Sequence, residues 1–132
     1  MRPLSFILSM LAFAFFSCAK PLSSAEENSP CIKGQLVKKG ICGHLVIAYV
    51  SGDSTGLQLN EQWKDTTTGK VYSHVFTVAN PCDFPDNLNE GAQVDFSVVN
   101  KGLKQCSLCE AYTPVPPASN HIKLSCSSEK AK

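Results

Sequence analysis

Two stretches decide the fold: Cys42–Val50 (CGHLVIAYV) and Val71–Ala79 (VYSHVFTVA). Both are rich in β-branched and aromatic residues and have the length of a strand rather than a helix. The first is apolar almost throughout, which predicts a strand buried on both faces, with His44 packed inside it. In the second, Tyr72, His74 and Phe76 alternate with other side chains. We therefore expect them to share one face, with His74 a packed core residue.

Further strands are predicted on either side of these two stretches. Each is short, carries alternating or β-branched apolar residues, and is bounded by turn-forming Gly, Pro, Asn or Asp. No stretch shows helical periodicity. A chain of about six or seven short strands predicts an all-β domain, either a small closed barrel or a β-sandwich. The order of its strands resembles the OB-fold at the level of architecture only. The further predicted strands are 33–37, 57–63, 93–99 and 121–125.

The start of the chain predicts export. Arg2 precedes an apolar run, 4–16, which is shorter than the roughly 20 residues of a membrane-spanning helix and matches a signal peptide. The run ends in Phe-Phe-Ser-Cys at 15–18. This ending resembles the lipobox of bacterial lipoproteins, in the looser form of Bacteroidetes-type bacteria, with Phe15 where Leu is usual. The resemblance implies that Cys18 is acylated and begins the mature protein. The alternative is ordinary secretion, with cleavage near Cys18 or after Ala25.

This start divides the chain into four parts. We predict a signal peptide over 1–17, and a flexible tether with the lipid-anchored Cys18 over 18–30. A β domain over 31–126 and a frayed end over 127–132 follow. The predicted location is the bacterial cell envelope, on a membrane.

Charge excludes one class of partner. Without Arg2, the 11 Lys of the chain balance its 11 Asp and Glu residues. Nucleic-acid binding needs a basic face, so we expect no nucleic-acid partner. The same balance argues against attraction to a membrane through basic residues, which leaves the N-terminal lipid as the predicted membrane contact.

Cysteine content predicts covalent cross-links. Seven cysteines are present, and six remain once Cys18 is set aside. An even number in a small exported domain is typical of a disulfide framework, and spacing does not choose among the 15 possible pairings. The six disulfide candidates are Cys31, Cys42, Cys82, Cys106, Cys109 and Cys126.

The Cys106-Ser107-Leu108-Cys109 motif has two alternative interpretations. A CxxC motif can carry thiol-disulfide chemistry, or half of a zinc site completed by histidines. Here no βαβ pattern surrounds it and no second CxxC or HxxxH exists. We therefore interpret it as two structural cysteines with different partners, and predict no metal and no cofactor.

No catalytic signature stands out, so the main hypothesis is a non-enzymatic binding module. The chain lacks GxSxG, HExxH and a phosphate-binding glycine loop. Trp63, Tyr72 and Tyr112 are the candidate ligand-binding residues, for an unknown protein or saccharide. Two alternatives stay open: a thiol-disulfide or metal-handling envelope protein using the CxxC, and a secreted disulfide-rich inhibitor.

Overall fold

The structure, a computed structural model, describes residues 30–124 and 126. The predicted signal peptide, Cys18, nearly all of the tether and the C-terminal end from 127 lie outside the described residues. Within them the domain is built of strands, and the one helical element is a single 3-10 turn, η1 (Pro81–Asp83). The strands are β1 (Ile32–Lys39), β2 (Leu45–Ser51), β3 (Asn60–Lys64), β4 (Val71–Val78), β5 (Gln93–Val98), β6 (Ser119–Asn120) and β7 (Ile122–Leu124).

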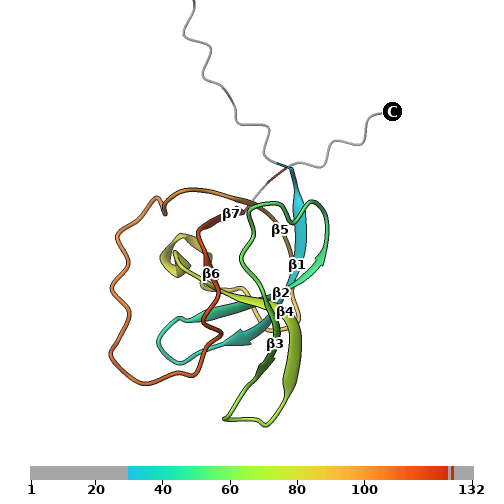
Figure 1. The fold of residues 1–132 in the computed structure, drawn as a ribbon. Coiled ribbons are helices and arrows are strands. Elements are labelled where there is room, and N and C mark those ends of the chain that lie inside the picture. The colour runs from blue at the N-terminus through green and yellow to red at the C-terminus, as the bar shows by residue number, and fades with distance from the viewer. Residues whose placement is uncertain (1–29, 125, 127–132) are drawn as a thin grey trace, which may run out of the picture.

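All seven strands belong to one curled sheet (Figure 1). Its order is β3-β4-β2-β1-β5-β7, and every neighbouring pair in this order is antiparallel. The short β6 pairs parallel to β4. The all-β, disulfide-linked fold predicted from the sequence is thereby confirmed.

Strand β1 lies at the centre of the sheet and bends. It pairs with β2 on one side and with β5 on the other, and its register to β2 shifts twice, at Lys33/Gly34 and at Leu36/Lys38. Irregularities of this kind bend a strand and increase its twist. A side chain at Gly34 would lie 2.6 Å from Ile47 and 3.0 Å from Phe96. The absence of a side chain at Gly34 therefore leaves room for Ile47 of β2 and Phe96 of β5 to pack over β1.

The core lies inside this curl. Side chains from β1, β2, β4, β5 and β7 fill it, and Phe76 of β4 packs against Phe96 of β5 with ring centroids 5.7 Å apart. The alternation predicted for β5 is confirmed from Gln93 to Phe96: Val94 and Phe96 are buried, and Gln93 and Asp95 are exposed. The buried cluster comprises Ile32, Leu36, Leu45, Ile47, Phe76, Val78, Phe84, Val94, Phe96 and Ile122.

The prediction that His74 packs in the core is wrong. His74 is exposed and has a φ of 53°, a left-handed backbone conformation that residues other than glycine rarely adopt. The ladder to β3 skips it, pairing Ser73 with Gln62 and then Val75 with Asn60. The left-handed backbone at His74 interrupts the alternation of β4 without changing its register to β3, and Val75 and Phe76 are both buried. A strict period of two could not anticipate a left-handed residue inside the strand.

The expectation for His44 is wrong as well. Strand β2 begins at Leu45, and the residues from Ile41 to His44 form the turn that joins it to β1. Gly40 N–H donates to the His44 carbonyl (2.7 Å), and Gly43 N–H donates to Gly40 (3.0 Å). The buried run is shorter than the predicted Cys42–Val50: Leu45, Val46 and Ile47 are buried, but Val50 is exposed.

The sheet is not a closed barrel, so the barrel alternative is wrong. The last segment pairs with β4 through β6 and with β5 through β7, and His121 separates the two short strands. The prolines at 114, 116 and 117 have no N–H to donate, which keeps the chain before Ser119 out of a ladder.

Two buried asparagines bridge backbone where no ladder exists. Asn80 Nδ2 donates to the Ile122 carbonyl (2.8 Å), and Ile122 N–H donates to Asn80 Oδ1 (2.9 Å). Asn120 makes the same reciprocal pair with Gln58, at 2.8 and 2.9 Å. A side-chain amide has the same donor and acceptor as a peptide group, so each asparagine acts as a short piece of strand.

Replacing Asn80 by Ala should therefore lower the free energy of unfolding by about 2 kcal/mol, because the buried N–H and carbonyl of Ile122 lose their partners. Equilibrium denaturation measures this loss. Asn87→Ala is the control, since Asn87 is exposed and should change stability little. Equal stabilities for the two variants would contradict the bridging role of Asn80.

Candidate functional site

Three disulfides cross-link the domain. Cys31 pairs with Cys126, Cys42 with Cys109, and Cys82 with Cys106, with Cα–Cα distances of 5.4, 5.2 and 5.4 Å. All six predicted cysteines are used. Cys106 and Cys109 of the CxxC motif have different partners, as the structural interpretation expects. Three disulfides are consistent with an extracellular or periplasmic protein.

Two of these bridges hold the segment after β5, which we call the stapled loop (residues 100–113). It has no regular secondary structure. Cys82–Cys106 joins it to η1, and Cys42–Cys109 joins it to the β1–β2 turn. A loop without ladder hydrogen bonds is normally mobile, so the two covalent links restrict it.

Besides the two disulfides, hydrogen bonds to Asp83 hold the stapled loop. Its carboxylate accepts from the backbone N–H groups of Leu103 (2.7 Å) and Lys104 (2.8 Å), and from Asn80 Nδ2 (2.7 Å). The hydrogen bond from Asn80, then that from Leu103, lowers the pKa of Asp83 below its ordinary value, and Lys104 adds to the effect.

Two large apolar side chains stand in water beside the Cys42–Cys109 bridge. Ile41 is 85% exposed and Tyr112 is 88% exposed. The neighbours of Ile41 contact those of Tyr112: a side chain at Gly40 would meet Thr113, and Cys42 Sγ lies 3.9 Å from the Ala111 carbonyl. Ile41 and Tyr112 therefore belong to one surface, which we call the apolar tip.

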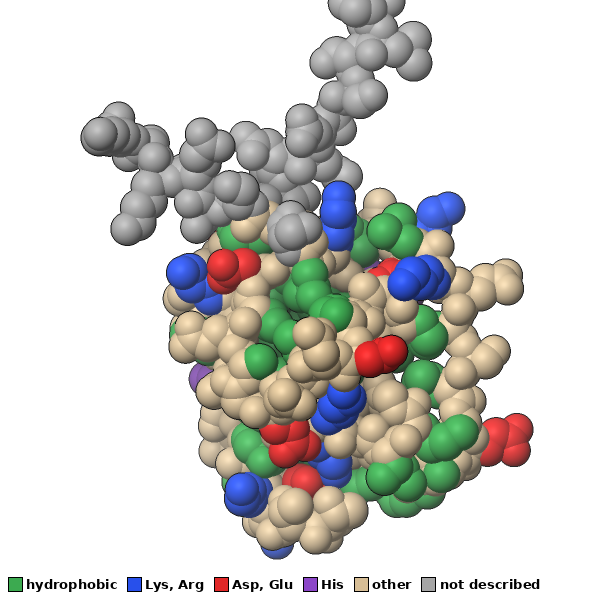
Figure 2. All heavy atoms as spheres, turned by 180° about the vertical axis from the view of Figure 1, so that it is seen from behind, with side chains coloured by type: hydrophobic (Ala, Val, Ile, Leu, Met, Phe, Trp, Pro, Cys, Tyr) green, Lys and Arg blue, Asp and Glu red, His purple; other side chains and the backbone are tan. Residues whose placement is uncertain are grey.

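The surface carries charged side chains of both signs. Figure 2 shows basic and acidic side chains interspersed with groups of hydrophobic ones on one face, as a chain with balanced charge predicts. Neither sign forms a continuous patch on that face. Exposed apolar groups are thus the more distinctive surface feature.

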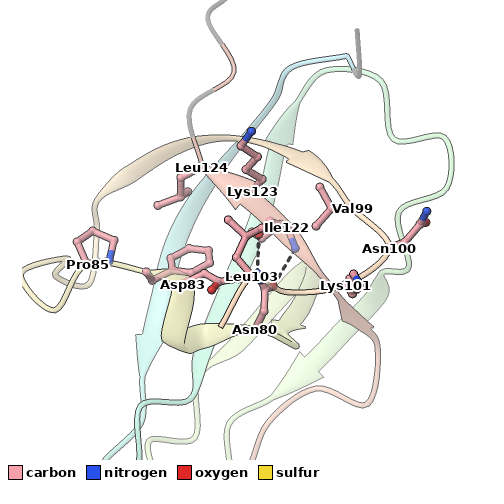
Figure 3. A pocket seen from close by; sticks show the side chains of 11 residues that line it. Asn80, Asp83, Pro85, Val99, Asn100, Lys101, Leu103, Ile122, Lys123 and Leu124 are labelled. Carbon is pink, nitrogen blue, oxygen red and sulfur yellow. Dashed lines mark hydrogen bonds between the residues drawn. The ribbon is translucent and has the colours of Figure 1, made fainter. Parts of the chain in front are cut away.

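A cavity of about 620 Å³ lies between η1, β7 and the start of the stapled loop (Figure 3). The core forms its floor, because Ile122 is fully buried and Phe84 nearly so. Five polar side chains also line it: Asn80, Asp83, Asn100, Lys101 and Lys123. The apolar lining residues are Phe84, Pro85, Val99, Leu103, Ile122 and Leu124.

The candidate residues Trp63 and Tyr72 lie elsewhere, on the β3–β4 hairpin. Their rings stack on each other at 6.0 Å with an interplanar angle of 21°, and Lys38 Nζ lies 5.5 Å from the Trp63 ring centroid. These rings thus contact their own chain. The structure brings Trp63 and Tyr72 together, but it does not bring Tyr112 of the apolar tip to them.

The same hairpin holds a buried ion pair. Asp65 is 1% exposed, and its Oδ1 accepts from Lys38 Nζ (2.8 Å) and from Thr67 N–H (2.9 Å) and Oγ1 (2.6 Å). Thr68 Oγ1 donates to Oδ2 (3.0 Å). Burial by itself raises the pKa of Asp65, but the hydrogen bonds from Lys38 and the threonines outweigh it and hold the pKa well below its ordinary value. The Asp65–Thr68 turn is therefore built around this carboxylate.

Metal ligands do not gather within residues 30–124 and 126: no group of three His, Cys, Asp or Glu side chains there could hold an ion. His74 is exposed, and His44 and His121 are half-buried in separate segments. In the same part of the chain, no helix has the length and apolar character needed to cross a bilayer.

The sequence did not reveal the apolar tip or the cavity. Tyr112 was singled out as an aromatic residue, but its neighbour Ile41 was not, because their proximity depends on the Cys42–Cys109 pairing. The signal that could have found both surfaces was an apolar residue close to a cysteine: Ile41 next to Cys42, and Leu103 three residues before Cys106.

Comparison with known proteins adds no relative to these observations. No family model, curated protein or solved structure matches the chain significantly. Arguments about function therefore start from the disulfides, the apolar tip and the cavity themselves.

Proposed function

We propose that this chain is a non-enzymatic, lipid-anchored envelope protein whose β domain binds another protein through the apolar tip. The observation that carries the proposal is the pair Ile41 and Tyr112, more than four-fifths exposed beside a disulfide. Large apolar side chains in water are unfavourable for the isolated domain. Such side chains contribute strongly to the free energy of binding when a partner buries them.

Rigidity supports this assignment. Binding costs free energy when side chains and loops must be ordered first. Here Cys42–Cys109 joins the two segments that carry the tip, and Cys82–Cys106 and Asp83 hold the rest of the stapled loop. A protein partner is favoured over a saccharide, because the stacked rings of Trp63 and Tyr72 already contact their own chain.

Photo-crosslinking tests the interface. A photoreactive amino acid at position 112 or 41, in the organism that makes the protein, should give a discrete protein adduct. The matched control is position 71, because Val71 is also apolar and 59% exposed but lies on β4. Equal adducts at 71 and 112, or none at 41 and 112, would count against the proposed interface.

The membrane anchor is a separate part of the proposal. It rests on the sequence Phe15-Phe16-Ser17-Cys18 at the end of the apolar run. Acyl chains contribute about 0.8 kcal/mol per buried methylene, so several chains would hold a small domain firmly on a membrane. Cys18→Ala should move the protein from the membrane fraction to the soluble fraction, while Ser17→Ala should not. A Cys18→Ala variant that still pellets with membranes would refute the anchor.

The alternative based on the CxxC motif needs two thiols that cycle between states. In the structure, Cys106 and Cys109 belong to different bridges, 24 and 67 residues from their partners. This arrangement favours a structural role for both cysteines. Alkylation of Cys106 and Cys109 in the native, unreduced protein would instead support thiol-disulfide or metal chemistry.

The secreted-inhibitor alternative shares the stapled loop with the main proposal and differs in the anchor and the partner. It would be favoured if the protein were found free of lipid and its crosslinked partner were a protease.

A further inference from the structure

We propose that the cavity between η1, β7 and the stapled loop is a second binding site, for a small amphipathic anion with one apolar chain. This site is separate from the apolar tip, and the inference does not depend on a protein partner. It rests on three features of the cavity: its apolar floor, its unpaired lysines and its fixed walls.

The size and lining of the cavity suit an apolar chain. Its volume of about 620 Å³ falls within the range of roughly 300–1,000 Å³ that is typical of small-molecule sites. Phe84 and Ile122 form a buried apolar floor, while Leu103 stands at the edge and is 83% exposed. An apolar ligand would cover Leu103 and remove that side chain from water.

Charge at the cavity favours a negative head group. Lys101 and Lys123 line the cavity, both are exposed, and neither forms an ion pair with a carboxylate of the described residues. The cavity also contains Asp83, but both oxygens of its carboxylate already accept hydrogen bonds from Asn80, Leu103 and Lys104. Asp83 thus already accepts three hydrogen bonds from its own chain, whereas the two lysines are charged donors without a carboxylate partner among the described residues.

The walls of the cavity are fixed before any ligand arrives. Asn80 holds Ile122 through two hydrogen bonds, and Asp83 holds the backbone at Leu103 and Lys104 (Figure 3). Cys82–Cys106 adds a covalent link between the η1 wall and the loop wall. A cavity whose opposite walls are joined in this way does not need to be ordered by its ligand.

Calorimetric titration of the full-length protein tests the inference. The probes are three compounds with the same twelve-carbon chain, used below their micelle concentrations: dodecanoate, dodecyl phosphate and dodecyltrimethylammonium. Both anions should bind once per protein, and the cation should bind at least about tenfold more weakly, since each charge contact contributes about a factor of a few at a solvent-exposed site. The ratio of the two anion affinities separates a carboxylate ligand from a phosphate ligand.

Two variants assign the binding to this cavity. Lys101→Gln with Lys123→Gln should weaken both anions about tenfold and should not weaken the cation, because it removes two positive charges. Leu103→Ser should weaken all three probes, because it removes contact with the chain. The control, Lys64→Gln with Lys70→Gln, changes two exposed lysines of the β3–β4 hairpin and should have no effect.

Equal affinities for the anions and the cation would overturn the inference, and so would unchanged anion binding in the Lys101/Lys123 variant. Absence of binding by all three probes would overturn it too. None of these results bears on the crosslinking of Ile41 and Tyr112, so the two binding proposals fail independently.

Discussion

Replacing Cys31 and Cys126 together by Ala should lower the free energy of unfolding by about 4–5 kcal/mol, the largest effect expected for any one bridge. This bridge closes a loop of 95 residues, whereas Cys42–Cys109 closes 67 and Cys82–Cys106 closes 24. Cross-linking restricts the unfolded chain more strongly when the loop is longer. Equilibrium denaturation of the three variants, each lacking both cysteines of one bridge, measures the order of these stability losses.

The expected order of loss is Cys31–Cys126, then Cys42–Cys109, then Cys82–Cys106, with the last near 3.5 kcal/mol at about 25 °C. Removing both cysteines of a pair avoids a free thiol that could exchange with the other bridges. Melting unchanged in all three variants would show that the bridges do not stabilise the domain. A largest loss for Cys82–Cys106 would show that native contacts of the stapled loop, rather than loop length, set the effect.

The second large effect is expected at Asp65. Asp65→Asn should lower the free energy of unfolding by about 3 kcal/mol at pH 7, because it leaves Lys38 without its charge partner in a mostly buried position. The new amide also directs a donor toward groups that are themselves donors, Thr67 and Lys38. Asp95→Asn is the matched control: Asp95 is exposed on β5, and its side chain makes no hydrogen bond with the described residues.

The pH dependence of stability distinguishes this ion pair from simple packing. The folded state lowers the pKa of Asp65 from an ordinary value near 3.8. The unfolded state therefore binds the proton first as the pH falls, so the contribution of Asp65 is complete above about pH 5 and is lost progressively below pH 4. Asp83 shifts in the same direction, so the wild type keeps some acid sensitivity from that residue.

Denaturation curves between pH 2 and 7 should accordingly converge. Wild type and Asp65→Asn should differ most at neutral pH and least at pH 2, while Asp95→Asn should follow the wild type throughout. A constant difference between wild type and Asp65→Asn at every pH would mean that the substitution acts through shape and not through charge.

Much of the fold follows from local pattern. Burial of Leu45 to Ile47, the centre of the predicted strand, and of Val94 and Phe96 agrees with the sequence, because the burial of each follows from its own apolar pattern on a strand. Six cysteines in a small domain also indicated three bridges. None of these predictions needed knowledge of which segments meet.

Features that depend on contacts between distant segments could not be predicted from the sequence. The left-handed residue His74 breaks a period-two pattern that otherwise looks regular, and Asn80 acts as a strand surrogate only because Ile122 lies opposite. The apolar tip likewise exists because Cys42 pairs with Cys109, one of many combinations that spacing allows. The closed-barrel alternative is wrong for a similar reason. The pairing of the two-residue β6 and the three-residue β7 cannot be predicted from the residues of these strands alone.

The central claim is a rigid, exported domain whose loop is held by two specific bridges. The most direct test is mass spectrometry of the natively processed protein, alkylated without any reduction and then digested under non-reducing conditions. The account predicts a mature chain that starts at acylated Cys18, no alkylated cysteine, and linked peptides for Cys31–Cys126, Cys42–Cys109 and Cys82–Cys106. A chain without lipid, with Cys106 and Cys109 alkylated or linked to each other, would contradict it.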